Sequence, residues 1–255
     1  MAVVTAAKRR AVPEAHAATR ESIERAIEHI WERYSEPVSL DELSKSALLS
    51  RFHFARTFRE ITGVTPGRFL SAVRIHQAKR MLVDTPRTIT DISSAVGYQS
   101  LGSFTNYFTQ SVGMPPSQFR HLAEGTAVGL HPSENCSGLR VYVGVFPTPI
   151  LQSPPIAAKI IDAAYGHPFD CVLPDVPPGT WFVHAVASTR ATGPDRRTDQ
   201  PLFVDRRDAV TVGAPRDLRV SLRLRPRRPT DPPVLLALPD LRPLPTARPI
   251  AGRVG

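Results

Sequence analysis

In the first half of the chain, apolar residues recur at steps of three and four positions, which is the spacing of an amphipathic helix. The pattern is clearest from Thr19 to Tyr34, and Pro37 follows it as a terminator. Ser39 and Glu42 then have the spacing of a capping box, which predicts a short helix as far as about Ala47. The first part of the chain is therefore predicted to be helical.

Two further helices follow in the same region. Ser50 is a candidate N-cap for a helix that ends at Gly63, a residue suited to the left-handed position after a helix. Thr65 and Pro66 have the order expected at a helix start, and they open a longer helix as far as about Val83. Two short helices joined by a tight turn, the second of which ends at a glycine, are typical of a helix-turn-helix.

The helical region contains an internal sequence repeat. Five residues recur at an offset of fifty: Phe54, Phe58, Gly63, Pro66 and Phe69 become Phe104, Phe108, Gly113, Pro116 and Phe119. Residues of the preceding short helix recur at an offset of forty-nine: Leu40, Leu43, Ala47 and Leu49 become Ile89, Ile92, Val96 and Tyr98. One extra residue has therefore entered the second turn, and the chain is predicted to hold two helix-turn-helix units with a long helix between them.

The repeated positions and the varied positions lie on opposite helix faces. Phe54 and Phe58 share one face of their helix, and Phe104 and Phe108 share the equivalent face. The outward residues are Phe52, Arg56 and Arg59 in the first copy and Gly102, Asn106 and Thr109 in the second. Shared residues are thus predicted to form the core, and the varied residues the surface.

One pair of surface positions suggests a function. Arg56 and Asn106 are equivalent, and in the DNA major groove arginine pairs with guanine and asparagine with adenine, each through two hydrogen bonds. One scaffold with two different readers would recognise two different base sequences. The alternative, two solvated helix faces without function, fits less well with a formal net charge of +9, which favours an anionic partner such as nucleic acid.

Proline marks a change of architecture after residue 125. Only six of the 26 prolines precede that point, so the second half cannot form long helices. Alternation of apolar and polar residues predicts strands at Leu139–Val145 and Leu218–Arg225, with Arg219, Arg223 and Arg225 facing water. Shorter strands are predicted at Asp170–Leu173, Thr180–Ser188, Leu202–Val204, Ala209–Val212 and Val234–Leu238. We expect an all-β antiparallel sandwich behind an all-α, homeodomain-like double helix-turn-helix.

Residues 21–121 resemble the DNA-binding region of the AraC/XylS family of transcriptional regulators. The matching residues lie in TITDISSAVGYQSLGSFTNYFTQSVGMPPSQFR (88–120) and, for the first repeat and linker helix, in LSRFHFARTFREITGVTPGRFL and VRIHQAKRML. The resemblance implies two recognition helices that enter successive major grooves on one face of double-stranded DNA. It implies base contacts from Phe52, Arg56, Gly102, Ser103 and Asn106, and we expect backbone contacts from Ser50, Arg51, Arg59, Arg68, Ser100, Thr105 and Thr109.

Two features qualify what the resemblance implies. Most members of this family carry the DNA-binding part at the C-terminus behind a cupin-like effector domain, whereas here it comes first, so no ligand class is inherited. The stretch FDCVLPDVPPGTWFVHAVAS is similar to a hairpin of transthyretin-like domains, which extends a second resemblance over roughly residues 138–240. The β region is therefore a candidate for effector sensing, dimerisation or contact with RNA polymerase.

No motif indicates an enzyme. The eight histidines are scattered, and phosphate loops and nucleophile elbows are absent from the sequence, so we expect no catalytic residues, no metal and no cofactor. His184 is expected to be structural, and the two cysteines, Cys136 and Cys171, to be idle thiols. Two rival functions remain open: an enzyme or ligand-binding β domain that the helices target to DNA, and an architectural DNA binder without base preference.

The expected organisation follows from these patterns. We predict a disordered extension (1–18), a DNA-binding domain (19–123), a linker (124–137), a β-sandwich (138–240) and a disordered tail (241–255). No apolar run is long enough to span a membrane, and the N-terminus has its basic residues after its short apolar run, which is the wrong order for a secretory signal. A cytoplasmic protein is expected.

Overall fold

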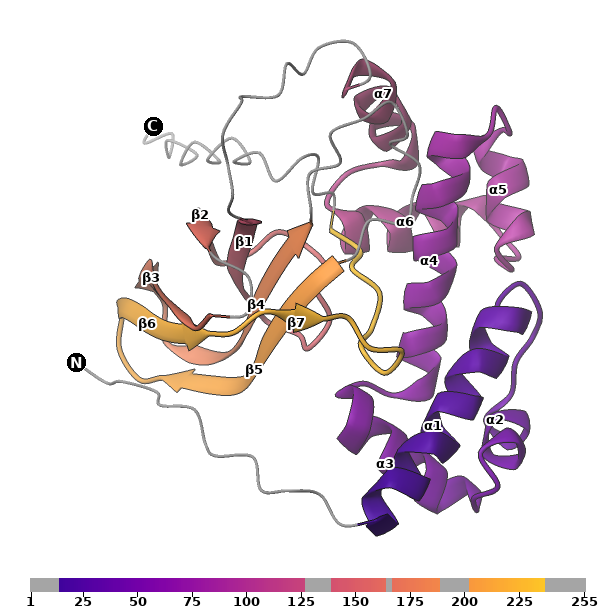
Figure 1. Cartoon of the computed structure of the whole chain (residues 1–255). Coiled ribbons are helices and arrows are strands. Elements are labelled where there is room, and N and C mark those ends of the chain that lie inside the picture. The colour runs from indigo at the N-terminus through magenta and orange to yellow at the C-terminus, as the bar shows by residue number, and fades with distance from the viewer. Residues whose placement is uncertain (1–13, 127–138, 164–166, 189–201, 237–255) are drawn as a thin grey trace, which may run out of the picture.

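The computed structural model describes residues 14–126, 139–163, 167–188 and 202–236 (Figure 1). The first of these ranges is helical and the others form antiparallel sheets, as predicted. The helices are α1 (Glu14–Arg33), α2 (Leu40–Ser46), α3 (Arg51–Thr62), α4 (Pro66–Asp84), α5 (Ile89–Ala95), α6 (Leu101–Val112) and α7 (Pro116–Thr126). Helix α1 begins at Glu14, five residues before the predicted start at Thr19, because Glu14–Ala18 contains three alanines and favours the helix.

The predicted helix starts are confirmed in position and partly in chemistry. Ser39 and Glu42 form a complete capping box: Ser39 N–H donates to Glu42 Oε2 at 2.9 Å, and Glu42 N–H donates to Ser39 Oγ at 3.2 Å. At the start of α5 only one half of a capping box forms: the Thr88 side chain accepts a hydrogen bond from the N–H of Asp91 at 3.1 Å. Ser50 occupies the N-cap position of α3, but its side chain makes no capping hydrogen bond there.

The duplicated core is built from two equivalent aromatic groups. Phe54, Phe58, Phe104 and Phe108 are all fully buried. Phe58 packs edge-on against Phe69 with ring centroids 5.6 Å apart, and its counterpart Phe108 packs against Phe119 at 5.9 Å. The repeated sequence skeleton therefore encodes the same packing in both helix-turn-helix units.

The turn before α6 is one residue longer than the turn before α3, as the change of offset predicts. Residues 47–50 separate α2 from α3, whereas residues 96–100 separate α5 from α6. Helix α4 joins the two units: it packs against α1 and α3 of the first unit and against α5 and α7 in the second (Figure 1). The two recognition helices, α3 and α6, are thus carried on one central helix.

The β region is a sandwich of two antiparallel sheets. The strands are β1 (Leu139–Phe146), β2 (Ala157–Ala163), β3 (Phe169–Val176), β4 (Gly179–Ser188), β5 (Leu202–Val212), β6 (Arg216–Leu222) and β7 (Arg225–Pro226). One sheet has the order β2-β1-β4-β5-β7, and β3 pairs with β6 in the other. Buried residues of both sheets, such as Val143, Val183, Leu173 and Val220, belong to a single apolar cluster. The predicted fold class is confirmed.

Strand β2 was not predicted, because its sequence does not alternate. Ile160 and Ile161 are adjacent and therefore point to opposite sides of the sheet. Ile161 packs on the core between the sheets, and Ile160 packs on a second apolar cluster that contains Leu236. A strand that is covered on both faces lacks the period-two signal on which the prediction depends.

The four strands predicted after residue 200 differ from those in the structure. Leu202–Val204 and Ala209–Val212 are parts of one strand, β5, because Asp205 and Arg206 continue the ladder with Ala185 and His184. The predicted strand at Leu218–Arg225 is split: β6 pairs with β3, whereas β7 pairs with β5 in the other sheet. Residues 234–236 form no strand, and residues 237 and 238 lie outside the described ranges.

Of the three arginines predicted to face water, Arg219, Arg223 and Arg225, only two are exposed. Arg219 and Arg223 are exposed, as predicted. Arg225 is instead partly buried and forms a two-fold ion pair with Asp231, with both nitrogen–oxygen distances at 2.7 Å. The pair ties the segment that follows β7 back to that strand. The predicted linker and tail fall largely on residues 127–138 and 237–255, which lie outside the described ranges.

Candidate nucleic-acid interface

The outward face of α3 is open and basic. Phe52 is 95% exposed and the Arg56 side chain is 81% exposed. Arg59 is exposed too, and together with Glu60 and Thr65 these residues line a shallow open depression. The predicted readers of the first repeat are therefore brought together on one surface, away from the buried phenylalanines.

The residues expected to contact the DNA backbone flank this depression. Ser50, Arg51 and Arg68 are all exposed, and they stand at the starts of α3 and α4. Arg51 Nε lies 3.5 Å from the carboxylate of Asp41 on α2, an exposed pair that is worth little energetically. Cations at these positions can therefore turn toward phosphate groups at small cost.

The outward face of α6 is open but uncharged. Gly102, Ser103 and Asn106 are exposed, whereas Thr105 and Thr109 are partly buried. A Cβ atom added to Gly102 would meet nothing within 4 Å, so the backbone there is accessible to a ligand. This face offers hydrogen-bonding groups and a bare backbone, whereas α3 offers cations.

Four of the residues predicted to contact DNA from α6 are hydrogen-bonded to one another in two pairs. Ser100 caps α6 by accepting from Ser103 N–H at 3.2 Å, and its hydroxyl lies 2.9 Å from the Ser103 hydroxyl. The Thr109 hydroxyl donates to the Thr105 carbonyl at 2.7 Å. Asn106 is exposed on the same face of α6.

Two features of this surface were missed in the sequence. Glu60 accepts a hydrogen bond from Arg56 Nε at 2.9 Å, and the i,i+4 spacing of the two residues was the signal that could have revealed the pair. Leu48 is 80% exposed and has a φ of 57°, in the turn between α2 and α3. Its equivalent in the second repeat is Gly97, with a φ of 87°, so the offset of forty-nine already indicated a left-handed turn position.

The β region contains a buried histidine, His184. His184 is 6% exposed, its Nε2 lies 3.2 Å from the Thr148 carbonyl oxygen, and burial lowers its pKa to about 4. Within the described ranges, no three His, Cys, Asp or Glu side chains are grouped as metal ligands would be. Cys171 is buried, and burial raises the pKa of its thiol; Cys136 lies outside the described residues.

Comparison with known proteins assigns the helical part. Residues 43–121 match the protein family described as helix-turn-helix domain. The chain is 35% identical over 96 residues to an uncharacterised HTH-type transcriptional regulator, YobQ, of Bacillus subtilis (strain 168), a match that spans 36% of this chain and 37% of that protein. Residues 43–121 are therefore a helix-turn-helix domain, similar to that of HTH-type transcriptional regulators.

Other relatives match a stretch of similar length. The lactose operon transcription activator of Staphylococcus xylosus is 30% identical over 101 residues, which cover 40% of this chain and 36% of that protein. A crystal structure of a transcriptional regulator with an AraC-type DNA-binding domain from Chromobacterium violaceum is 22% identical, with a TM-score of 0.40, and covers 42% of this chain and 96% of that one. The chain spans less than half the length of the curated relatives that it matches.

One further fact concerns membranes. Among the helices that the structure describes, none combines the length and the apolar character needed to cross a lipid bilayer.

Proposed function

We propose that the whole chain is a sequence-specific transcriptional regulator that reads two successive major grooves of double-stranded DNA with α3 and α6. The observation that carries the proposal is the contrast between the two faces of the repeat. Phe54, Phe58 and their counterparts are fully buried and identical, whereas Arg56 and Asn106 are exposed and different. A repeat that keeps its core and varies its surface is suited to reading two different sequences.

The exposed side chains have the chemistry of base readers. Arg56 would donate two hydrogen bonds to guanine, and Asn106 would make two with adenine. The ring of Phe52 would contact a thymine methyl group, Ser103 would add a hydrogen bond, and Gly102 would let the backbone approach the groove. Phosphate contacts would come from the flanking residues: Ser50, Arg51, Arg59, Arg68, Ser100, Thr105 and Thr109.

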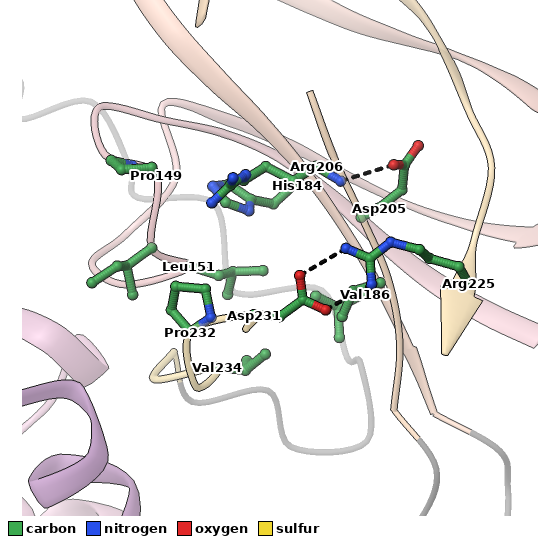
Figure 2. A pocket seen from close by; sticks show the side chains of 13 residues that line it. Pro149, Leu151, His184, Val186, Asp205, Arg206, Arg225, Asp231, Pro232 and Val234 are labelled. Carbon is green, nitrogen blue, oxygen red and sulfur yellow. Dashed lines mark hydrogen bonds and ion pairs between the residues drawn. The ribbon is translucent and has the colours of Figure 1, made fainter. Parts of the chain in front are cut away.

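For the β region we propose a role in regulation rather than catalysis. A small cavity lies between β4, β5 and the segment after β7, and Leu151, His184, Arg206, Asp231 and Val234 are among the residues that line it (Figure 2). It is the candidate site for a small-molecule effector. The β region would also serve in dimerisation or in contact with RNA polymerase. Its resemblance to transthyretin-like domains is part of the same proposal. The protein would act in the cytoplasm.

Two rival functions are distinguishable by experiment. An enzyme that is targeted to DNA would turn over a substrate through residues of the β region, and a variant that lacks base reading would keep that activity. An architectural binder would bind every sequence equally. The B. subtilis protein AdaA, 31% identical over 104 residues, is named a bifunctional transcriptional activator and DNA repair enzyme, so the enzyme alternative has a precedent among relatives.

The test is a binding-site selection with the full chain, starting from random duplex DNA. We expect enrichment of a site with two conserved blocks whose centres are roughly 10 base pairs apart, one per recognition helix. Affinity for that site should fall steeply with salt, since each neutralised phosphate contributes about −0.9 to the log–log slope. Recovery of unselected sequence would refute base reading, and a flat salt response would remove the basic face of α3 from the mechanism.

A further inference from the structure

Among the described helices, α4 is the element that joins the two helix-turn-helix units. Helix α4 packs against α1 and α3 at one end and against α5 and α7 at the other. If α4 were the only link, bending of that helix would change the distance and angle between α3 and α6. A protein that must reach two grooves in a fixed register needs a second connection.

The β region makes one contact at the end of α3. Arg206, on β5, donates from Nη1 to the carbonyl oxygen of Thr62 at 2.8 Å. Carbonyls in the last turn of a helix lack helical donors and carry partial negative charge, so a guanidinium there is favourable. Gly63 makes the approach possible, because a Cβ atom at that position would lie only 2.5 Å from Arg206 Nη1.

The β region makes an equivalent contact at the end of α6. Ser153, in the loop between β1 and β2, donates from its backbone N–H to Ser111 O at 2.8 Å and from its hydroxyl to Gln110 O at 2.6 Å. Leu236 lies nearby, since a Cβ atom at Gly113 would be 3.9 Å from its Cδ1. Gly63 and Gly113 are equivalent residues of the repeat, so the β region contacts the same end of both recognition helices.

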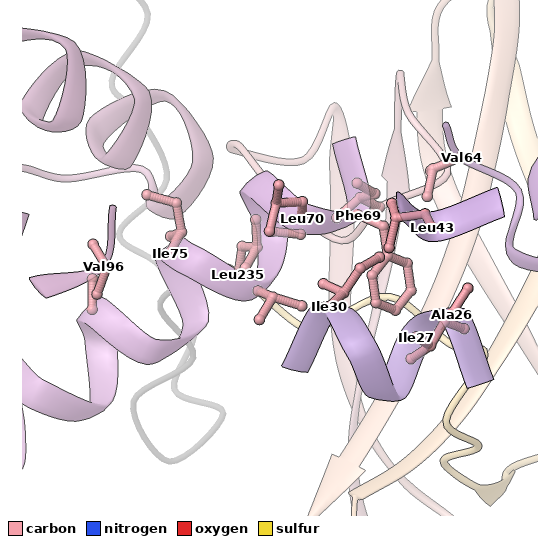
Figure 3. Packing of buried hydrophobic residues seen from close by; sticks show 14 of the residues in the cluster. Ala26, Ile27, Ile30, Leu43, Val64, Phe69, Leu70, Ile75, Val96 and Leu235 are labelled. Atoms are coloured by element: carbon pink, nitrogen blue, oxygen red, sulfur yellow. The ribbon is translucent and has the colours of Figure 1, made fainter. Parts of the chain in front are cut away.

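A third contact lies between these two, on α4. Lys79 Nζ donates to the carbonyl oxygens of Val234, Leu235 and Leu236 at 3.4, 3.0 and 3.1 Å. Leu235 and Ile150 are fully buried in the apolar core of the helical region (Figure 3). The contact is therefore a packed interface with polar anchors at both ends and in the middle.

The interface leaves the reading faces uncovered. Phe52, Arg56 and Asn106 remain exposed while Arg206 and Ser153 occupy the helix ends. A domain that inhibited DNA binding by masking would cover these faces instead. What the β region holds is the relative position of α3 and α6.

We propose that Arg206 and Ser153 are positioning residues of a brace, formed by residues 147–156, Arg206 and residues 227–236, which fixes the spacing that the protein accepts between its two half-sites. The proposal rests on the proposed DNA-reading function. Inserting one base pair between half-sites turns one of them by about 35° and moves it by about 3.4 Å. A braced pair of helices cannot follow that change, whereas a pair joined only by α4 can bend toward it.

The experiment measures the dissociation constant of the full chain on three duplexes, by fluorescence anisotropy at one salt concentration. The duplexes carry the selected site and the same site with one base pair added or removed between the two blocks. For the wild type we expect each spacing change to weaken binding about 10-fold or more, as a misplaced half-site loses its base contacts. Arg206→Ala and Ser153→Ala should reduce that penalty to about 3-fold or less, with affinity for the selected site retained within about 3-fold.

Arg219→Ala is the matched control, because it removes an exposed arginine of β6 and should keep the wild-type penalty. Ser153→Ala removes only one hydroxyl, so it tests the brace even if Arg206→Ala fails to fold, and thermal melting monitors both. A wild type that tolerates the altered spacings, or folded variants that keep its penalty, would overturn the brace while base reading stands. A wild type without base preference would overturn the proposed function itself.

Discussion

Arg56 and Glu60 form an ion pair on the outward face of α3, with Arg56 Nε 2.9 Å from Glu60 Oε1. Both side chains are largely exposed, at 81% and 60%, so the pair is worth no more than about 0.5 kcal/mol. Glu60 therefore holds the guanidinium along the helix surface without locking it. In the proposed complex with DNA, Arg56 would exchange the carboxylate for a guanine edge at little cost.

Removing the carboxylate should strengthen DNA binding. Glu60→Gln takes one negative charge away from the interface, so we expect a lower dissociation constant and a log–log salt slope steeper by up to about 0.9. The guanine preference should be retained, because the reader is unchanged. Glu28→Gln, an exposed glutamate of α1, is the control for net charge alone. Weaker binding with loss of the guanine preference would mean that Glu60 orients Arg56 instead of competing for it.

The two proposed readers should fail at different places in the site. Arg56→Ala should lose a guanine preference in one block, and Asn106→Ala an adenine preference in the other, each at a cost of about 1–3 kcal/mol. The affected positions should lie roughly 10 base pairs apart. Binding-site selection on both variants, with melting temperatures alongside, checks this. Blurring of the same base pairs by both variants, or a uniform loss of affinity, would show that these residues only contact the backbone.

The helical region was predictable because its signals are local. Capping residues such as Ser39 and stop residues such as Gly63 lie within a few positions of the element that they bound, and both have the predicted conformation. The repeat added an internal check, since the change of offset located the longer turn before α6. The outward positions of Arg56 and Asn106 followed from helical geometry alone.

Contacts between distant segments were not predictable. Arg206 and Thr62 are 144 residues apart, and nothing near Arg206 indicates that a polar strand residue will reach a helix end. The same holds for Lys79, whose ammonium group meets carbonyls that lie more than 150 residues away. A fragment of residues 17–123 would expose the sites that Ile150 and Leu235 fill, so its free energy of unfolding should be below that of the full chain.

Leu48 and Gly97 are equivalent turn residues and should respond in opposite ways to substitution. Leu48 has a φ of 57°, which costs a residue with a side chain about 1–2 kcal/mol, and its 80% exposed side chain contributes little packing. Leu48→Gly relieves that strain against an entropic cost of about 0.5–1 kcal/mol, so we expect a gain of about 0.5–1 kcal/mol in the free energy of unfolding.

Gly97→Ala should instead destabilise the protein. Its φ of 87° is unfavourable for alanine, and the added Cβ would lie 2.6 Å from the carbonyl oxygen of Ser35. We expect a loss of about 2 kcal/mol or more. Denaturant unfolding of the full chain measures both effects, and Leu48→Ala, which keeps the strained backbone, should remain near the wild type. A loss of stability in Leu48→Gly would show that the leucine side chain has an unrecognised structural contact.

The buried His184 and the partly buried His76 should make the protein acid-sensitive. Burial lowers the pKa of His184 to about 4 and that of His76 to about 3, and nearby Lys79, Arg80 and Arg227 lower the latter further. The ordinary value in the unfolded chain is about 6.5. Between these limits the unfolded state binds protons that the folded state does not, so the free energy of unfolding decreases as the pH falls from about 6.5 toward 4. Near pH 5 the two histidines together bind almost two more protons in the unfolded state than in the folded state. The free energy of unfolding then changes by about 2.7 kcal/mol per pH unit.

Replacing either histidine should halve the contribution of these two residues to the pH dependence of the free energy of unfolding. His76→Phe keeps a ring beside Trp31, whose centroid lies 5.6 Å from that of His76, and His184→Gln keeps a polar side chain near the Thr148 carbonyl. Each variant should lose about one proton from the pH dependence between pH 6.5 and 5, measured by denaturant unfolding across that range. Carboxylates of the folded protein also titrate toward pH 4, so the comparison is made above pH 5, where their contribution is shared by all three proteins. A slope that is equal in the wild type and in both variants would mean that these histidines are protonated in the folded state at pH 5, and that burial does not set their titration.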